Sequence, residues 1–78
     1  MVEANTIRAL GEVQNHMPAQ QGEVTGYYAG ITMQELAAQL GIPEHAIWFY
    51  SVNGNKVNPT YRLQPGETVT IHGPVDGG

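Results

Sequence analysis

The sequence of 78 residues contains no cysteine. Disulfide frameworks, thiolate metal sites and cysteine nucleophiles are therefore excluded. Only three residues are basic, and they are too scattered to form the phosphate-neutralising surface that nucleic-acid binding requires. No apolar run approaches the roughly 20 residues needed to cross a bilayer. The N-terminus lacks the basic start and apolar core of a signal peptide. These absences predict a soluble cytoplasmic protein with neither a nucleic-acid nor a membrane partner.

Motifs for side-chain chemistry are also sparse. The three histidines, His16, His45 and His72, share no metal-ligand spacing, so we expect no metal site. The glycines in the first half of the chain do not form a phosphate-binding loop after a strand. No Ser/His/Asp arrangement can be argued from spacing. We therefore predict that the chain is not an enzyme and holds no cofactor stably.

The composition of the sequence predicts one small globular domain. Hydrophobic residues make up 41% of the chain, which is typical of a folded protein. The net charge of -4 suits a partner with a basic docking groove. We expect the folded domain to span residues 1–73 and a flexible tail to span residues 74–78.

The clearest local pattern predicts a helix over residues 32–40. Thr32 and Glu35 have the spacing of a capping box, in which each side chain satisfies an amide of the first turn. Gly41 suits the left-handed position after a helix, and Pro43 blocks its extension. One apolar stripe along the helix comprises Met33, Leu36, Ala37 and Leu40.

Alternating and β-branched segments predict strands before and after this helix. Turn residues separate the later segments, at Asn53–Gly54 and at Pro65–Gly66. This order predicts an α+β domain, a mixed sheet of four to five strands with one main helix on one face. The predicted strands are 6–13, 23–29, 46–52, a short return strand at 56–58, and 68–72.

The segment 46–52 is apolar on both faces, although one short helix covers only one face of a sheet. Ile47 and Phe49 form one row, and the other row consists of Ala46, Trp48, Tyr50 and Val52. We assign the longer row to the core. Ile47 and Phe49 then lie on the open face, where a contiguous apolar patch indicates a partner surface. The alternative is a central strand whose second face is covered by loops or by a second copy of the chain.

The sequence closes on Gly77–Gly78, directly after Pro74, Val75 and Asp76. Without Cβ atoms, two glycines pass through a narrow channel and adopt φ values closed to other residues. They present an unhindered carboxylate, which ATP can activate as an acyl-adenylate. The alternative is a frayed tail, since chain termini are commonly disordered.

Together these segments resemble the ubiquitin-like β-grasp family, and within it the small sulfur carriers of the ThiS/MoaD type. A long first hairpin with Pro18 in its loop looks closer to the small subunit of molybdopterin synthase than to the shorter thiamine carrier. The chain departs from the family at His72–Gly73, where an aromatic or proline pair is common, and at Asp76, which is usually small or neutral. The segments that carry the resemblance are Ile31–Leu36, Leu40–Glu44, Val52–Gly54, Tyr61–Val69 and Pro74–Gly78.

The resemblance implies that Gly78 is the reactive residue. An adenylating enzyme resembling ubiquitin-activating enzymes would join its carboxylate to AMP, using ATP and Mg²⁺. A sulfur donor would then produce a thiocarboxylate, which delivers sulfur to a synthase such as the large subunit of molybdopterin synthase. Thiamine thiazole and other thio-metabolites are further acceptors in this family. The residues expected to contact partners are Gly77, Asp76, Val75, Pro74, Phe49 and Ile47.

Two other functions agree with the same sequence. A ubiquitin-like modifier would use the same tail to form isopeptide bonds with lysines of target proteins. A β-grasp interaction module would bind partners through its body and leave the tail inert.

Overall fold

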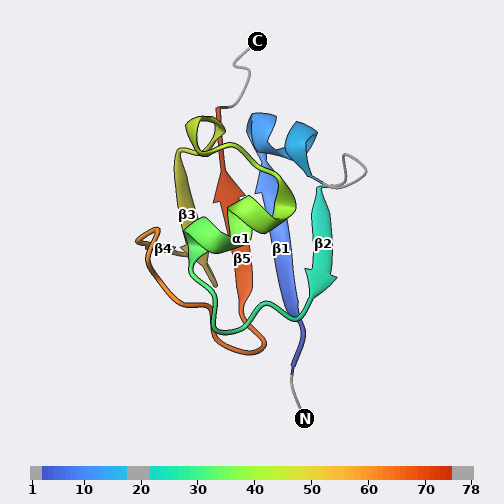
Figure 1. Ribbon diagram of the computed structural model, residues 1–78, viewed down its shortest axis with the longest axis vertical. Coiled ribbons are helices and arrows are strands. Elements are labelled where there is room, and N and C mark those ends of the chain that lie inside the picture. The colour runs from blue at the N-terminus through green and yellow to red at the C-terminus, as the bar shows by residue number, and fades with distance from the viewer. Residues whose placement is uncertain (1–2, 18–21, 75–78) are drawn as a thin grey trace.

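The chain forms a five-stranded sheet with one α-helix across one of its faces (Figure 1). The computed structural model describes residues 3–17 and 22–74. The strand order is β2-β1-β5-β3-β4, so β1 and β5 lie side by side near the middle. In chain order the elements are β1 (Asn5–Leu10), the 3₁₀ helix η1 (Gly11–His16), β2 (Glu23–Gly26), α1 (Met33–Leu40), the 3₁₀ helix η3 (Glu44–Ala46), β3 (Phe49–Val52), β4 (Asn55–Val57) and β5 (Thr68–His72).

The sheet is mixed. β1 runs parallel to β5 and antiparallel to β2, whereas β3 runs antiparallel to both β5 and β4. A parallel pair requires a long crossover connection, and here the crossover carries α1 over one face of the sheet. This arrangement is the β-grasp fold, so the predicted fold class is confirmed.

α1 is fixed at both ends by the residues that the sequence predicts. The Thr32 hydroxyl accepts a hydrogen bond from the Glu35 amide at 3.2 Å. The Glu35 carboxylate in turn accepts one from the Thr32 amide at 2.9 Å. Gly41 ends the helix with φ +78°, a conformation that glycine adopts without penalty. The predicted helix over 32–40 is confirmed, with Thr32 as its N-cap.

The core lies between α1 and the face of the sheet that it covers. On β5, Val69 and Ile71 are fully buried, and Met33 and Leu36 of α1 are fully buried against the sheet. Burying a side chain of this size contributes about 1.5–3 kcal/mol, so each of these four residues contributes substantially to the stability of the domain. The other buried apolar residues are Ile7, Ala9, Val13, Met17, Ala37, Ile42, Ala46, Tyr50, Val52 and Leu63.

The first two strands are shorter than predicted. The strand expected over 6–13 ends at Leu10, because Gly11 adopts φ +74° and the chain continues as η1. The strand expected over 23–29 ends at Gly26. In both places an apolar pattern continues beyond the last residue of the strand.

The strand predicted over 46–52 is wrong in its first half. The 3₁₀ helix η3 takes Ala46, and β3 begins only at Phe49. A short apolar run does not by itself distinguish a strand from a turn that buries the same residues.

The predicted turn after β3 and the final strand are confirmed. Asn53 and Gly54 both have positive φ, at 51° and 89°, as a tight hairpin of two central residues requires. The return strand β4 starts at Asn55 and ends at Val57, one residue earlier than the predicted 56–58. β5 spans Thr68–His72, as predicted.

Candidate partner-binding surface

The face of the sheet opposite α1 carries a row of three side chains at one end. Leu10 of β1 pairs in register with His72 of β5, and His72 pairs with Phe49 of β3. Ile7 and Ala9 of β1 are buried toward the helix, so the alternation of the strand turns Leu10 to the open face. Leu10 is 48% exposed there.

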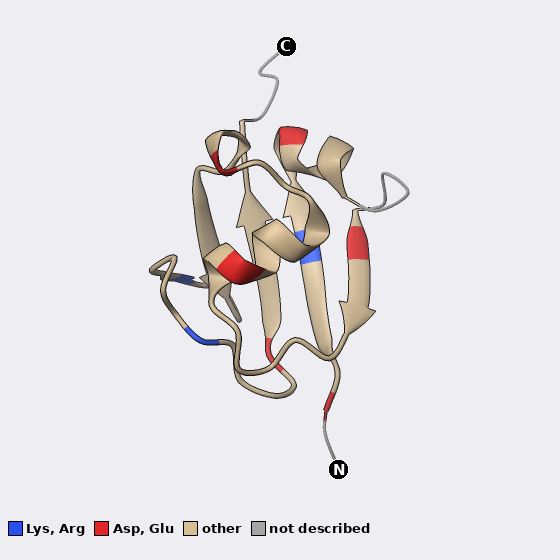
Figure 2. Ribbon diagram, viewed as in Figure 1, with Lys and Arg blue, Asp and Glu red and all other residues tan. Residues whose placement is uncertain are grey.

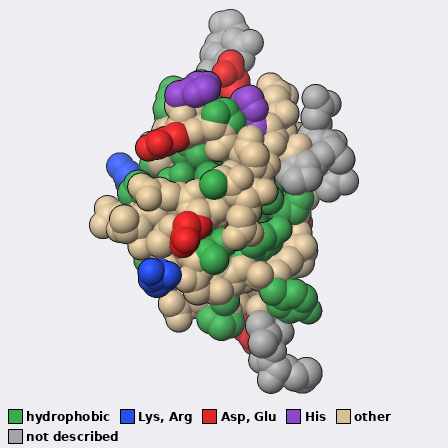
Figure 3. All heavy atoms as spheres, viewed as in Figure 1, with side chains coloured by type: hydrophobic (Ala, Val, Ile, Leu, Met, Phe, Trp, Pro, Cys, Tyr) green, Lys and Arg blue, Asp and Glu red, His purple; other side chains and the backbone are tan. Residues whose placement is uncertain are grey.

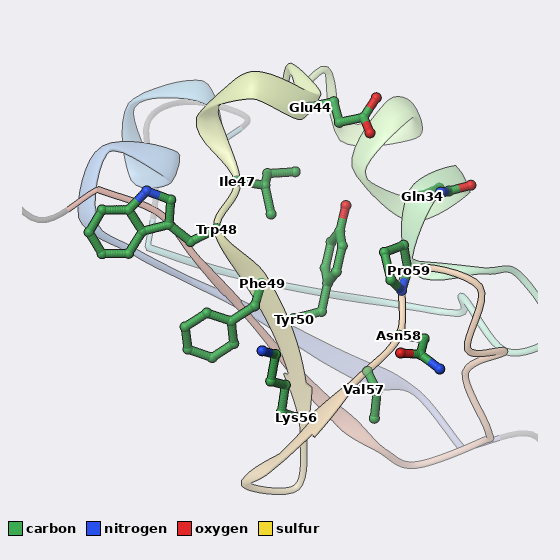
Figure 4. A pocket seen from close by; sticks show the side chains of 10 residues that line it. All are labelled: Gln34, Glu44, Ile47, Trp48, Phe49, Tyr50, Lys56, Val57, Asn58 and Pro59. Atoms are coloured by element: carbon green, nitrogen blue, oxygen red, sulfur yellow. The ribbon is translucent and has the colours of Figure 1, made fainter.

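A β-bulge adds a fourth side chain to this row. The Trp48 amide donates to the His72 carbonyl at 2.7 Å, while Phe49 is the register partner of the same His72. Two consecutive residues therefore oppose one, which disrupts the alternation of side chains. In Figure 4, Trp48 and Phe49 lie on one side of the strand, and Ile47 and Tyr50 lie on the other. We call Leu10, Trp48, Phe49 and His72 the exit patch.

The bulge explains where the predicted facing is right and where it is wrong. Trp48, assigned to the core, is instead 64% exposed. Phe49 lies on the open face as predicted, but Ile47 does not, because it packs against the core. The predicted core row is confirmed at its other three positions, which are Ala46, Tyr50 and Val52.

His72 lies at the centre of the exit patch, between its register partners Leu10 and Phe49. It stacks on Phe49 with ring centroids 4.1 Å apart and an interplanar angle of 9°. Its Nε2 shares a hydrogen bond with the Ser51 hydroxyl at 2.9 Å. Burial lowers the pKa of His72 below its usual value, so the neutral form is favoured at physiological pH. The patch therefore behaves as an apolar and aromatic surface.

Charged side chains lie beside the patch. The Lys56 ammonium lies 5.5 Å from the centroid of the Phe49 ring, within the range of a cation–π interaction. Arg8 and Glu23 form an exposed ion pair at 3.4 Å on β1 and β2. Figure 2 shows acidic residues on α1, β2, η1 and η3 and far fewer basic ones. An apolar centre with a polar rim is the usual composition of a protein interface.

The chain leaves the sheet directly beside the exit patch. The Gly73 amide donates to the Leu10 carbonyl at 3.1 Å, and the Glu12 amide donates to the Pro74 carbonyl at 2.8 Å. Gly78 follows Pro74 by four residues. Four extended residues span at most about 14 Å. Gly78 can therefore lie no farther than this from Pro74, at the end of the domain that carries the exit patch.

Several residues named from the sequence lie outside the described residues. They include Pro18 in the predicted hairpin loop, the proposed reactive residue Gly78, and three of the proposed partner contacts, Val75, Asp76 and Gly77. The structure thus brings Phe49 and Pro74 to one end of the domain and places Ile47 on the other side of β3.

The sequence interpretation missed Leu10 and Trp48 as surface residues. The alternation of β1 around Ile7 and Ala9 contains the signal for Leu10. Trp48 offers no such signal, because a bulge depends on the pairing with β5 and has no local pattern here.

A groove lies along β3 and β4 at the edge of the sheet, and its lining includes Trp48 and Phe49 as well as residues on the helix side (Figure 4). It consists of two adjoining hollows of about 250 and 260 Å³, both lined by Gln34, Glu44 and Tyr50. Burial, and secondarily the charge of Glu44, raise the pKa of Tyr50, so its hydroxyl stays protonated. The polar groups that both hollows share are therefore the neutral Tyr50 hydroxyl, the Gln34 amide and the Glu44 carboxylate.

The described residues 3–17 and 22–74 contain no group of three or more His, Cys, Asp or Glu side chains that could hold a metal ion. Figure 3, which shows the helix side, places histidine side chains near the end of the domain at which β1 and β5 end. Within the same described ranges, no helix is long and apolar enough to span a bilayer.

Neither a protein-family model nor a curated protein matches the sequence. Among solved structures, the chain is similar to the solution structure of the Haloferax volcanii HVO 2177 protein, with a TM-score of 0.65 and 16% identity. The match covers 99% of this chain and 88% of that one. At this identity the likeness shows the fold alone, and it supports the same small α+β architecture with a mixed sheet and one helix.

Proposed function

We propose that the protein is a sulfur carrier and a cosubstrate of an adenylating enzyme, not an enzyme itself. The observation that carries the proposal is the position of Pro74, where the proposed tail begins. Pro74 is hydrogen-bonded to Glu12 directly beside the exposed exit patch, four residues before Gly78. The patch would bind the partner while the diglycine enters its active site.

The chemistry requires only the carboxylate of Gly78 from this chain. A carboxylate oxygen attacks the α-phosphorus of ATP, and pyrophosphate leaves, which gives an acyl-adenylate. Hydrosulfide then attacks the Gly78 carbonyl carbon. AMP leaves with the bonding electrons, and the product is a thiocarboxylate. The partner supplies Mg²⁺ and the acid–base groups, while this chain supplies position and reach.

The absence of cysteine supports the same proposal. A thiol in the carrier would compete with the sulfur donor for the activated acyl group. Among final acceptors, we favour a molybdopterin precursor held by a synthase large subunit, because the first hairpin resembles the small subunit of that enzyme.

Intact mass spectrometry tests the proposal. The protein is incubated with ATP, Mg²⁺, sulfide and a ubiquitin-activating-type enzyme from the same organism. We expect a mass increase equal to the exchange of one oxygen for sulfur, localised to the C-terminal peptide. The mass of the untreated protein from its native cells must also show that the mature chain ends at Gly78.

Deletion of Gly78 provides the control, since it should abolish the mass change and leave the melting temperature unaltered. Adenylation without sulfur uptake would instead favour a protein modifier, and conjugates isolated from cells would then be expected. The complete absence of a change, with the enzyme active on its own carrier, would favour an interaction module with an inert tail.

A further inference from the structure

The chain leaves β5 through a slot that has no room for a side chain at Gly73. A Cβ atom built on Gly73 would lie 2.6 Å from the Ala46 carbonyl oxygen and would also overlap a methyl group of Val13. Real Cβ atoms essentially never approach other atoms this closely. The slot therefore lies between η1, which contains Val13, and η3, which ends at Ala46.

Gly11 forms the other tight point of this slot. A Cβ atom on Gly11 would lie 2.7 Å from the Gly73 carbonyl oxygen and would overlap the Pro74 carbonyl. Gly11 also has φ +74°, a conformation that other residues adopt only at a cost. Glycine is therefore needed at this position both for its backbone conformation and for space.

Hydrogen bonds hold the exiting chain on the side of η1. The Leu10 carbonyl and the Glu12 amide, which flank Gly11, bond to Gly73 and Pro74 respectively. The turn at Gly11 points these two groups at the two successive residues of the exit. This contact requires the chain to pass closer to Gly11 than a side chain would allow.

We infer that Gly11 and Gly73 are positioning residues that clamp the chain as far as Pro74 and so fix the point from which the C-terminal residues extend. The purpose of the clamp rests on the proposed function. When the segment Gly73–Pro74 is held in place, fewer residues must be ordered as the carboxylate enters a partner. The held segment also keeps the carboxylate within reach of a site beside the exit patch. The clamp acts on the approach of the carboxylate to ATP and leaves the apolar contacts of docking unchanged.

The variant Gly11→Ala tests this inference against the matched control Gly41→Ala. Gly41 has φ +78°, so both substitutions impose a similar backbone penalty, but a Cβ atom on Gly41 meets nothing within 4 Å. Gly73→Ala is a second test, because its expected effect comes from the lack of space alone.

Hydrogen exchange of the Glu12 amide measures the clamp without any partner. We expect exchange in Gly11→Ala and Gly73→Ala to quicken about tenfold, as for the loss of one hydrogen bond, and to stay unchanged in Gly41→Ala. Unchanged exchange in both clamp variants would overturn the inference. Failure of both clamp variants to fold, with Gly41→Ala folded, would also overturn it, because the glycines would then be required by the core.

Adenylation kinetics measure whether the clamp at Gly11 and Gly73 contributes to the rate at which the partner enzyme adenylates Gly78. With the partner enzyme, Gly11→Ala and Gly73→Ala should lower kcat by up to about a hundredfold, the loss expected for a misplaced reactant, with KM nearly unchanged. A weakened clamp with normal kcat would overturn the positioning role. If the unaltered protein is not adenylated at all, the proposed function fails, and hydrogen exchange still decides whether the clamp exists.

Discussion

The two ends of the central β1–β5 pair are held together in different ways. Where β1 begins, the side chain of Asn5 is fully buried and donates hydrogen bonds to the carbonyls of Gln64 and Glu67, at 2.8 and 3.2 Å. It also accepts one from the Tyr28 amide at 3.0 Å. Where β1 ends, backbone hydrogen bonds hold the exiting chain, and aromatic side chains remain exposed.

A second set of internal hydrogen bonds lies at the Asn5 end, around the carboxylate of Glu67. The Tyr61 hydroxyl donates to both oxygens of the Glu67 carboxylate, at 2.8 and 2.9 Å, and this raises the pKa of Tyr61. The Gln64 amide donates to the same carboxylate at 2.8 Å. At this end the polar groups are used in hydrogen bonds within the fold, whereas the exit end exposes the apolar side chains of Leu10 and Trp48. The comparison predicts that substitutions at the two ends separate stability from binding.

The largest effect is expected for Asn5→Ala. Removal of this side chain leaves two carbonyls and one amide without their partner in a buried place, which costs about 3 kcal/mol of unfolding free energy. Chemical denaturation would measure this loss. Asn58→Ala, at an exposed asparagine, should change stability by less than about 0.5 kcal/mol. Equal losses in the two variants would contradict the role given to Asn5.

A smaller effect, now on binding, is expected for Trp48→Ala. An aromatic side chain that becomes buried at the centre of an interface contributes about 2 kcal/mol to the binding free energy. The KM for adenylation should therefore rise about thirtyfold. Tyr27→Ala is the matched control, since Tyr27 is 73% exposed and follows β2 at the Asn5 end. An equal rise in KM for both variants would show that docking is not confined to the exit end.

Phe49→Asp should weaken docking about tenfold, because it removes the stacked ring and places a charge in the apolar patch. Phe49→Leu keeps an apolar side chain and should retain most of the affinity. The melting temperature of Phe49→Asp should fall only slightly. A sharp fall would show that Phe49 belongs to the core.

Elements with a complete local signal were predicted from the sequence. The capping box of Thr32 and Glu35 and the left-handed Gly41 determine α1 within a few residues. The hairpin at Asn53–Gly54 is determined in the same way, because both residues accept positive φ. The last residue of β1 and the first residue of β3 were not predicted correctly, since they depend on contacts with residues distant in the sequence.

The candidate site was predicted only in part for the same reason. Phe49 could be assigned to the open face by alternation, but Trp48 and Ile47 could not, because the bulge forms only where β3 meets His72 of β5. The slot at Gly11 and Gly73 was also invisible, since these glycines are 62 positions apart in the sequence. The need for glycine at both positions becomes apparent only in the folded structure, where the two residues are in contact.

The smallest expected effect is a pH dependence of stability at the exit end. Burial lowers the pKa of His72 below 6.5 in the folded state, so the unfolded chain binds more protons between the two pKa values. The stability linked to His72 is therefore present above pH 6.5 and is lost as the pH falls from 6.5 towards the folded-state pKa. The change should be small, because His72 remains partly exposed.

His72→Gln should reduce this pH dependence, and urea unfolding midpoints above and below pH 6.5 would measure it. Glutamine keeps a polar group for Ser51 but does not titrate. His45→Gln, at an exposed histidine of η3, is the matched control and should leave the dependence as it is in the unaltered protein. A dependence that persists in His72→Gln but disappears in His45→Gln would place the titrating group outside the exit patch. The neutral, stacked His72 would then no longer explain why that surface is apolar.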